Sequence, residues 1–91
     1  MTHTDAYLEV TFRHGQPFAA YLHLHRQPRQ RPTKQRRVEP GMVVDLAADG
    51  TAVGIELTAP SQVSLPVLNK LLKELGLAPM QRIDLAPLTA A

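Results

Sequence analysis

Two histidines stand where a pair of imidazoles can reach one metal ion. His23 and His25 are two residues apart in an alternating stretch, so they share one face of an expected strand. His14, in the turn before that strand, is a candidate third ligand. A metal site also needs partners that orient each ring, and the sequence offers none. We therefore expect solvent-facing histidines, predict no metal and no cofactor, and keep His23 and His25 as the candidates for metal binding.

Carboxylates and hydroxyls are the other groups with potential chemistry. Glu9, Asp45 and Glu56 all fall on the expected solvent face of a sheet. Acid–base catalysis by paired carboxyls needs one of them in an apolar pocket, and an open face has none. Ser61 is expected in a loop and Ser64 as a helix cap, so neither is expected to act as a nucleophile. The chain is predicted not to be an enzyme and to have no catalytic residue.

Basic residues are clustered in one segment, although the net charge of the chain is only +2. Residues 26–37 hold six cations and no acid, and Pro28 and Pro32 keep the segment extended. Such a segment can neutralise phosphates without reading base sequence, or dock on an acidic protein, or remain a solvated loop. The candidate contact residues are Arg26, Arg29, Arg31, Lys34, Arg36 and Arg37.

The pattern of residues 38–58 predicts a β-hairpin, and the candidate residues above lie on it or beside it in the chain. Apolar residues alternate with polar or small ones on both sides of Asp49-Gly50, a dipeptide typical of tight hairpin turns. Pro40 and Gly41 interrupt the preceding strand. Gly54 falls in mid-strand, which indicates the close approach of another backbone or ring. The alternating apolar residues are Met42, Val44, Leu46, Val53, Ile55 and Leu57.

Alternation also predicts strands at 7–12 and 19–25, and 34–38 is expected to resume pairing. The inward residues are then Leu8, Val10, Phe12, Ala20, Leu22 and Leu24. Short connections favour neighbouring pairs, so the sheet is predicted as four antiparallel strands in meander order.

A helix is predicted after the hairpin. Ser64 is a good N-cap, Pro66 falls in the first turn, and Gly76 is the expected left-handed stop. The helix is amphipathic, with an apolar stripe of Leu68, Leu71, Leu72 and Leu75. This stripe is expected to cover one face of the sheet, which predicts a small α+β fold with one C-terminal helix.

Length and composition predict one small domain over residues 1–91. The core is expected at about 7–77, with a flexible basic loop at 26–34 and a C-terminal tail at 78–91. The tail is expected either to add a strand to a partner's sheet or to fray. The chain has no cysteine, no apolar run long enough to span a membrane and no signal-peptide pattern at its start. We therefore expect a cytoplasmic protein with no membrane contact.

A resemblance covers residues 7–61. The Ala20-Tyr21-Leu22 strand, the Asp49-Gly50 turn and the Val-Gly-Ile-Glu-Leu strand at 53–57 resemble the small bacterial family known as domain of unknown function 2283. The sequence departs from that family at His14–Pro17, where an acidic turn is usual, and in its arginine-rich segment. The resemblance implies the fold and no activity. It also suggests a bacterial accessory protein that binds a small protein partner, as antitoxins do.

Two functions from different classes follow as hypotheses. The first is a non-catalytic protein-interaction module acting as a homodimer, because a small sheet with one helix leaves strand edges and one face to be covered. The second is a nucleic-acid binder that uses residues 26–37 on the phosphate backbone.

Overall fold

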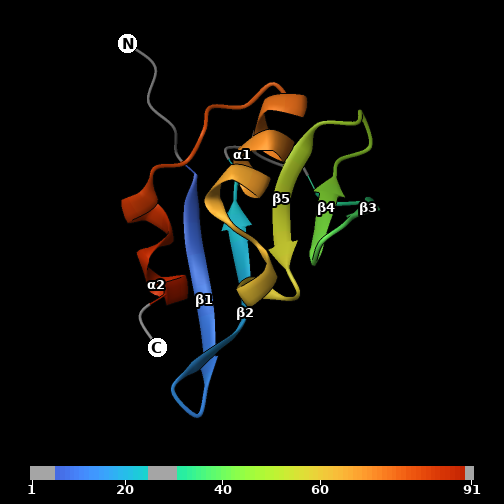
Figure 1. Ribbon diagram of the computed structural model, residues 1–91. Helices are drawn as coiled ribbons and strands as arrows, with labels where there is room; N and C mark the ends of the chain where they lie inside the picture. The colour runs from blue at the N-terminus through green and yellow to red at the C-terminus, as the bar shows by residue number, and fades with distance from the viewer. Residues whose placement is uncertain (1–5, 25–30, 90–91) are drawn as a thin grey trace.

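The structure is a computed structural model and describes residues 6–24 and 31–89. It has an α+β fold in which one antiparallel sheet of five strands carries helices on one face (Figure 1). The strands are β1 (Tyr7–Arg13), β2 (Gln16–His23), β3 (Lys34–Val38), β4 (Met42–Leu46) and β5 (Ala52–Leu57). The 3-10 helix η1 (Pro60–Gln62), the helix α1 (Leu65–Glu74), the 3-10 helix η2 (Arg82–Leu85) and the short helix α2 (Ala86–Thr89) follow.

The strands lie in the order β1-β2-β5-β4-β3, so the prediction of four strands in meander order is wrong. The β4–β5 hairpin lies between β2 and β3, and β2 pairs with β5 from Ala20 opposite Leu57 to His23 opposite Gly54. The reason lies in β3, whose sequence KQRRV leaves four of its five side chains exposed. A central strand must bury at least one face, so the apolar strands take the centre and β3 takes an edge.

The predicted hairpin around Asp49 and Gly50 is confirmed. Gly50 closes the turn with a φ of 89°, and its amide donates to the carbonyl oxygen of Ala47 at 2.9 Å. The amide of Thr51 donates to Oδ1 of Asp49 at 2.9 Å, so the side chain of Asp49 stabilises the turn between β4 and β5.

Helix α1 begins and ends where the sequence predicts. The amide of Val67 donates to Oγ of Ser64 at 3.3 Å, which caps the first turn. Gly76 has a φ of 74° just after the helix, and the amide of Leu77 donates back to the carbonyl oxygen of Leu72 at 2.8 Å. The residues that α1 buries are Leu68, Leu71 and Leu72.

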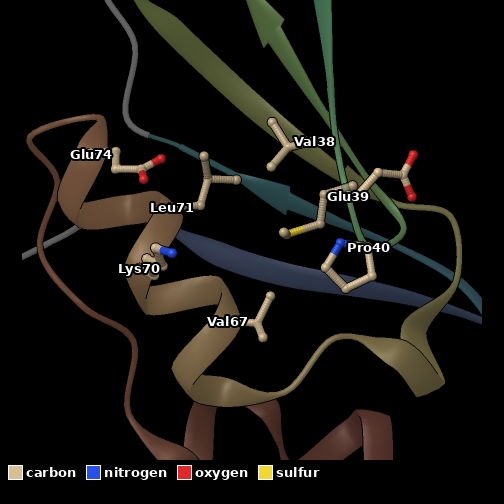
Figure 2. Close-up of a pocket in the computed structure, with 8 residues that line it drawn as sticks. Val38, Glu39, Pro40, Val67, Lys70, Leu71 and Glu74 are labelled. Atoms are coloured by element: carbon tan, nitrogen blue, oxygen red, sulfur yellow. The ribbon is translucent and has the colours of Figure 1, made fainter.

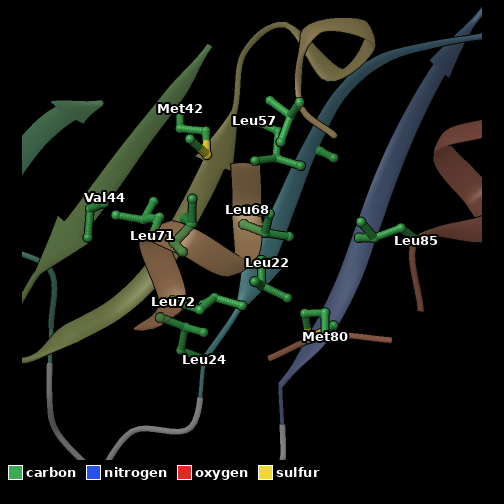
Figure 3. Close-up of a cluster of buried hydrophobic side chains, with 13 residues drawn as sticks. Leu22, Leu24, Met42, Val44, Leu57, Leu68, Leu71, Leu72, Met80 and Leu85 are labelled. Atoms are coloured by element: carbon green, nitrogen blue, oxygen red, sulfur yellow. The ribbon is translucent and has the colours of Figure 1, made fainter. Parts of the chain in front are cut away.

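One apolar core joins the sheet to the helices (Figure 3). It lies between α1 and the sheet face that carries the even-numbered residues of β2 and β4. The buried members are Ala20, Leu22, Leu24, Met42, Val44, Ile55, Leu57, Val63, Leu68, Leu71, Leu72, Met80 and Leu85. The predicted inward positions of β2, β4 and β5 are therefore confirmed except at two residues: Leu46 is half-buried against the core, and Val53 is buried outside this cluster. Leu85 and Met80 extend the core beyond the expected end at residue 77.

The C-terminal segment folds back on the core of its own chain. The side-chain amide of Asn69 holds it, since Oδ1 accepts from the amide of Met80 at 2.8 Å and Nδ2 donates to its carbonyl oxygen at 3.2 Å. Met80 and Leu85 are buried beside α1 and β1 (Figure 3). Both expectations for the tail, an added strand or a frayed end, are wrong for residues 80–89, which carry η2 and α2.

Candidate functional site

The face of the sheet opposite α1 carries polar and aromatic side chains in register. Tyr7 pairs with His23 across β1 and β2, and Asp45 pairs with Gln35 across β4 and β3. Because side chains alternate along a strand, these positions all project from the face that α1 leaves uncovered. We call this group the open-face cluster, and its members are Tyr7, Glu9, Tyr21, His23, Gln35, Asp45 and Glu56.

Asp45 is the centre of the cluster. The hydroxyl of Tyr21 donates to its Oδ2 at 2.7 Å, and Nε2 of Gln35 donates to its Oδ1 at 2.9 Å. Only 8% of Asp45 is exposed, so the prediction of a solvated charge on an open face is wrong for this residue. A carboxylate withdrawn from water needs hydrogen-bond donors. Gln35 of the adjacent β3 provides one, and Tyr21 of β2 provides the other from beyond β5.

Gly54 makes the link between Tyr21 and Asp45 possible. It lies on β5, between the β2 residue His23 and the β4 residue Asp45. A Cβ at this position would overlap the hydroxyl and ring carbons of Tyr21. The ring of Tyr21 therefore crosses β5 over the missing side chain, which confirms the prediction that a ring or backbone approaches Gly54 closely.

His23 is held by its neighbours on the open face. Its Nε2 lies 2.8 Å from Oε1 of Glu9, and its ring stacks on Tyr7 with 4.4 Å between ring centroids. The ring of Tyr21 meets His23 edge-on at a centroid distance of 4.7 Å. These contacts fix the position of the imidazole over β1 and β2.

The predicted histidine ligands do not come together in the described residues. His14 lies in the β1–β2 turn, at the opposite end of this hairpin from His23. His25 lies outside the described residues. Within 6–24 and 31–89, no group of three or more histidine, aspartate or glutamate side chains has the geometry to hold a metal ion.

Asp45, the buried member of the open-face cluster, has hydrogen bonds to both of its carboxylate oxygens. In the part of the chain that the structure describes, every buried side-chain nitrogen or oxygen has a hydrogen-bond partner. A general base or a nucleophile needs a lone pair or proton directed at a substrate, and both oxygens of Asp45 are already engaged. The arrangement therefore links β2, β4 and β3 across the uncovered face.

The basic segment contains the edge strand β3. Lys34, Arg36 and Arg37 lie on β3 and are exposed, and exposed Arg31 precedes them. The expected loop at 26–34 therefore ends at Lys34, where β3 begins. Lys34 and Arg36 lie opposite the core residues of β4 and Arg37 lies on the open face, so both faces of the edge are basic. Arg26 and Arg29 lie outside the described residues.

Large exposed apolar side chains lie along the β1–β2 hairpin and on η2, at the other side of the sheet from β3. Tyr7, Phe12 and Phe18 are 58%, 48% and 52% exposed on β1 and β2, and Ile83 of η2, which contacts β1, is 79% exposed. The prediction that Phe12 faces the core is wrong. The β1–β2 hairpin extends past Ala20, where the pairing of β2 with β5 ends (Figure 1). Phe12 lies on this projecting part, opposite Pro17.

Sequence reasoning missed the exposure of Phe12 because that exposure depends on how far β2 and β5 overlap. The alternation of β1 continues through Phe12, and the pattern alone gives no sign that β5 ends short of it. The guanidinium carbon of Arg13 lies 4.5 Å from the ring centroid of Phe18, which orders two side chains on the projecting hairpin.

A pocket of about 260 Å³ lies between the end of β3 and α1 (Figure 2). We call it the β3–α1 pocket. Its apolar lining consists of Val38, Pro40, Met42, Val67 and Leu71. Three charged residues also border it: Glu39 in the β3–β4 turn and Lys70 and Glu74 on α1.

No family model, curated protein or solved structure matches the chain. The resemblance to domain of unknown function 2283 therefore stays a prediction. Across residues 6–24 and 31–89, no helix has both the length and the apolar character needed to cross a membrane.

Proposed function

We propose that the chain is a non-catalytic protein-interaction module that acts as a homodimer joined through β1. The observations that carry the proposal are the exposed Tyr7 and Phe12 on β1 and the exposed Ile83 on η2, which contacts β1. No strand of the described residues pairs with the outer side of β1, and unpaired edges with apolar borders are templates for another chain. The proposed location is the cytoplasm, in keeping with a chain that has no cysteine.

The charges of β1 suit antiparallel pairing with a second copy of itself. If Thr11 faces Thr11 of the partner subunit, Glu9 faces Arg13 of the partner subunit, and Val10 faces Phe12 of the partner subunit. A two-fold axis repeats each pair, as an isologous interface requires. Opposite charges and apolar pairs across antiparallel strands each stabilise pairing by about 0.2–1 kcal/mol.

The other edge of the sheet does not suit such pairing. β3 carries Lys34, Arg36 and Arg37 and no acid, so two copies of β3 would place cations against cations. Charged edge residues are a common means of preventing strands from pairing with their own kind. The charge pattern therefore favours β1 as the dimer edge.

Light scattering after size exclusion tests the dimer. We expect twice the mass of one chain at tens of micromolar, and a dissociation constant at least about tenfold higher for the double variant Phe12→Ser/Ile83→Ser, because central apolar contacts dominate interface energy. Both positions are exposed, so the variant is expected to keep the circular dichroism spectrum of the parent. The variant Arg36→Gln/Arg37→Gln is the control and should remain dimeric. A parent chain that stays monomeric at high micromolar concentration refutes the proposal.

A second candidate function is the binding of a nucleic acid through its phosphate backbone. The observation in its favour is the basic edge, where Arg31, Lys34, Arg36 and Arg37 are exposed and no ion pair involving them is found within 6–24 and 31–89. Residues Arg26 and Arg29 belong to the same proposal. Binding of this kind weakens steeply as salt rises and does not depend on base sequence.

A further inference from the structure

We propose that the β3 edge and the β3–α1 pocket together bind an extended acidic peptide, which adds to the sheet as a strand and seats one apolar side chain in the pocket. The proposal rests on the proposed function in taking the chain as an interaction module, and it adds the chemistry of the partner. It uses the opposite edge of the sheet from the dimer, so the two can be measured separately.

The first step is the availability of the β3 edge. β4 occupies one side of β3, and no strand of residues 6–24 or 31–89 pairs with the other side. An edge strand presents main-chain N–H and C=O groups in a row, and an extended peptide can satisfy them by β-augmentation.

The second step is charge. Lys34 and Arg36 lie on the helix side of β3 and Arg37 lies on the open face. An added strand also projects side chains alternately to both faces, so glutamates or aspartates at successive positions would each meet a cation. The same cations repel a second copy of β3, which leaves an acidic partner as the complementary one.

The third step is the position of the pocket. Val38 at the end of β3 and Pro40 in the following turn form one wall, and Val67 and Leu71 of α1 form the other (Figure 2). The pocket volume of about 260 Å³ suits one aliphatic or aromatic side chain, because an apolar cavity of about 150 Å³ already accepts benzene. A peptide that pairs along β3 and continues past Val38 would bring an apolar side chain to this opening.

These three features favour a peptide over a nucleic acid. A phosphate backbone would use the cations of β3, but it has no strand edge to pair and no apolar side chain to bury. Glu39 and Glu74 also border the pocket, which suits the uncharged apolar side chain proposed there and not a phosphate. An acidic peptide with an apolar residue at one end uses the edge, the charge and the pocket together.

Fluorescence anisotropy with a synthetic peptide tests the proposal. The probe is a short labelled peptide of successive glutamates that ends in leucine, titrated with the full chain at 0.15 M salt. We expect Arg36→Gln/Arg37→Gln to weaken binding about threefold to tenfold, since each exposed charge pair is worth up to about 1 kcal/mol. We expect Val67→Phe, which fills the pocket, to weaken binding at least about tenfold.

Matched controls separate this site from net charge and from folding. Lys73→Gln/Arg82→Gln removes the same charge from exposed positions away from β3, and it should change affinity less than about twofold. A probe with proline at a central position should bind at least about tenfold more weakly, because proline cannot donate to the ladder. Hydrogen–deuterium exchange of the parent with its probe should show slower exchange at β3 amides, a readout that does not depend on how the variants fold.

Several results would overturn the proposal. Equal binding of the parent and proline probes would exclude strand addition, and equal binding by parent and Arg36→Gln/Arg37→Gln would exclude the basic edge. If a labelled DNA duplex binds more tightly than the peptide and displaces it, the edge is a phosphate site instead. Light scattering on the same samples reports the dimer independently, so a failed peptide experiment and a failed dimer remain distinguishable.

Discussion

Replacing Gly54 with valine is expected to lower the free energy of unfolding by about 3–5 kcal/mol. The new side chain would occupy the space in which the ring of Tyr21 crosses β5. Displacing that ring removes the hydrogen bond from its hydroxyl to Asp45, a carboxylate with only 8% exposure. Urea unfolding followed by circular dichroism measures the change through the midpoint and slope.

A double-mutant cycle shows whether the ring is the cause. Tyr21→Ala removes the obstacle, so Gly54→Val should cost at least about 1.5 kcal/mol less in the Tyr21→Ala background than in the parent. Ala48→Val, at an exposed position in the β4–β5 turn, is the control for adding β-branched bulk and should change stability by less than about 0.5 kcal/mol. Additive effects of Gly54→Val and Tyr21→Ala would mean that the two residues do not share this space.

Replacing Leu68 with alanine is expected to have an effect of similar size. Leu68 is fully buried at the centre of the α1 stripe, where it contributes to the core between helix and sheet (Figure 3). Leucine-to-alanine changes at such sites cost about 2.7–5 kcal/mol, and a domain of this size has about 5–15 kcal/mol in total. We therefore expect a large fall in the urea midpoint. Leu75→Ala, at the half-buried C-cap position of the same helix, should cost about half as much, and equal losses would contradict the packing shown.

The parts of the fold that the sequence predicts well depend on interactions between residues that are close together in the sequence. Ser64 caps α1, Gly76 ends it, and Asp49 and Gly50 form the hairpin turn, because each acts on backbone within a few residues. The close approach of a ring to Gly54 could also be predicted from the sequence, since a glycine within a strand often marks the close approach of another group.

The parts that the sequence does not predict depend on partners far along the chain. Asp45 has the alternation of a solvent-facing residue, and its burial follows from Tyr21 and Gln35, which strand order brings beside it. That order is itself non-local, because β2 pairs with β5 across the whole β3–β4 segment. Asn69 likewise gives no local sign that its amide holds Met80.

The strand order places β1 and β3 at opposite edges of the sheet. In a homodimer joined at β1, the two β3 edges therefore lie at the far ends of one continuous sheet, and the assembly is bivalent. A ligand with two acidic segments on a linker long enough to span those ends would bind its second segment at a high effective concentration. Avidity of this kind depends on both edges, so a weak single-site affinity at β3 is compatible with tight capture of a tandem or clustered ligand.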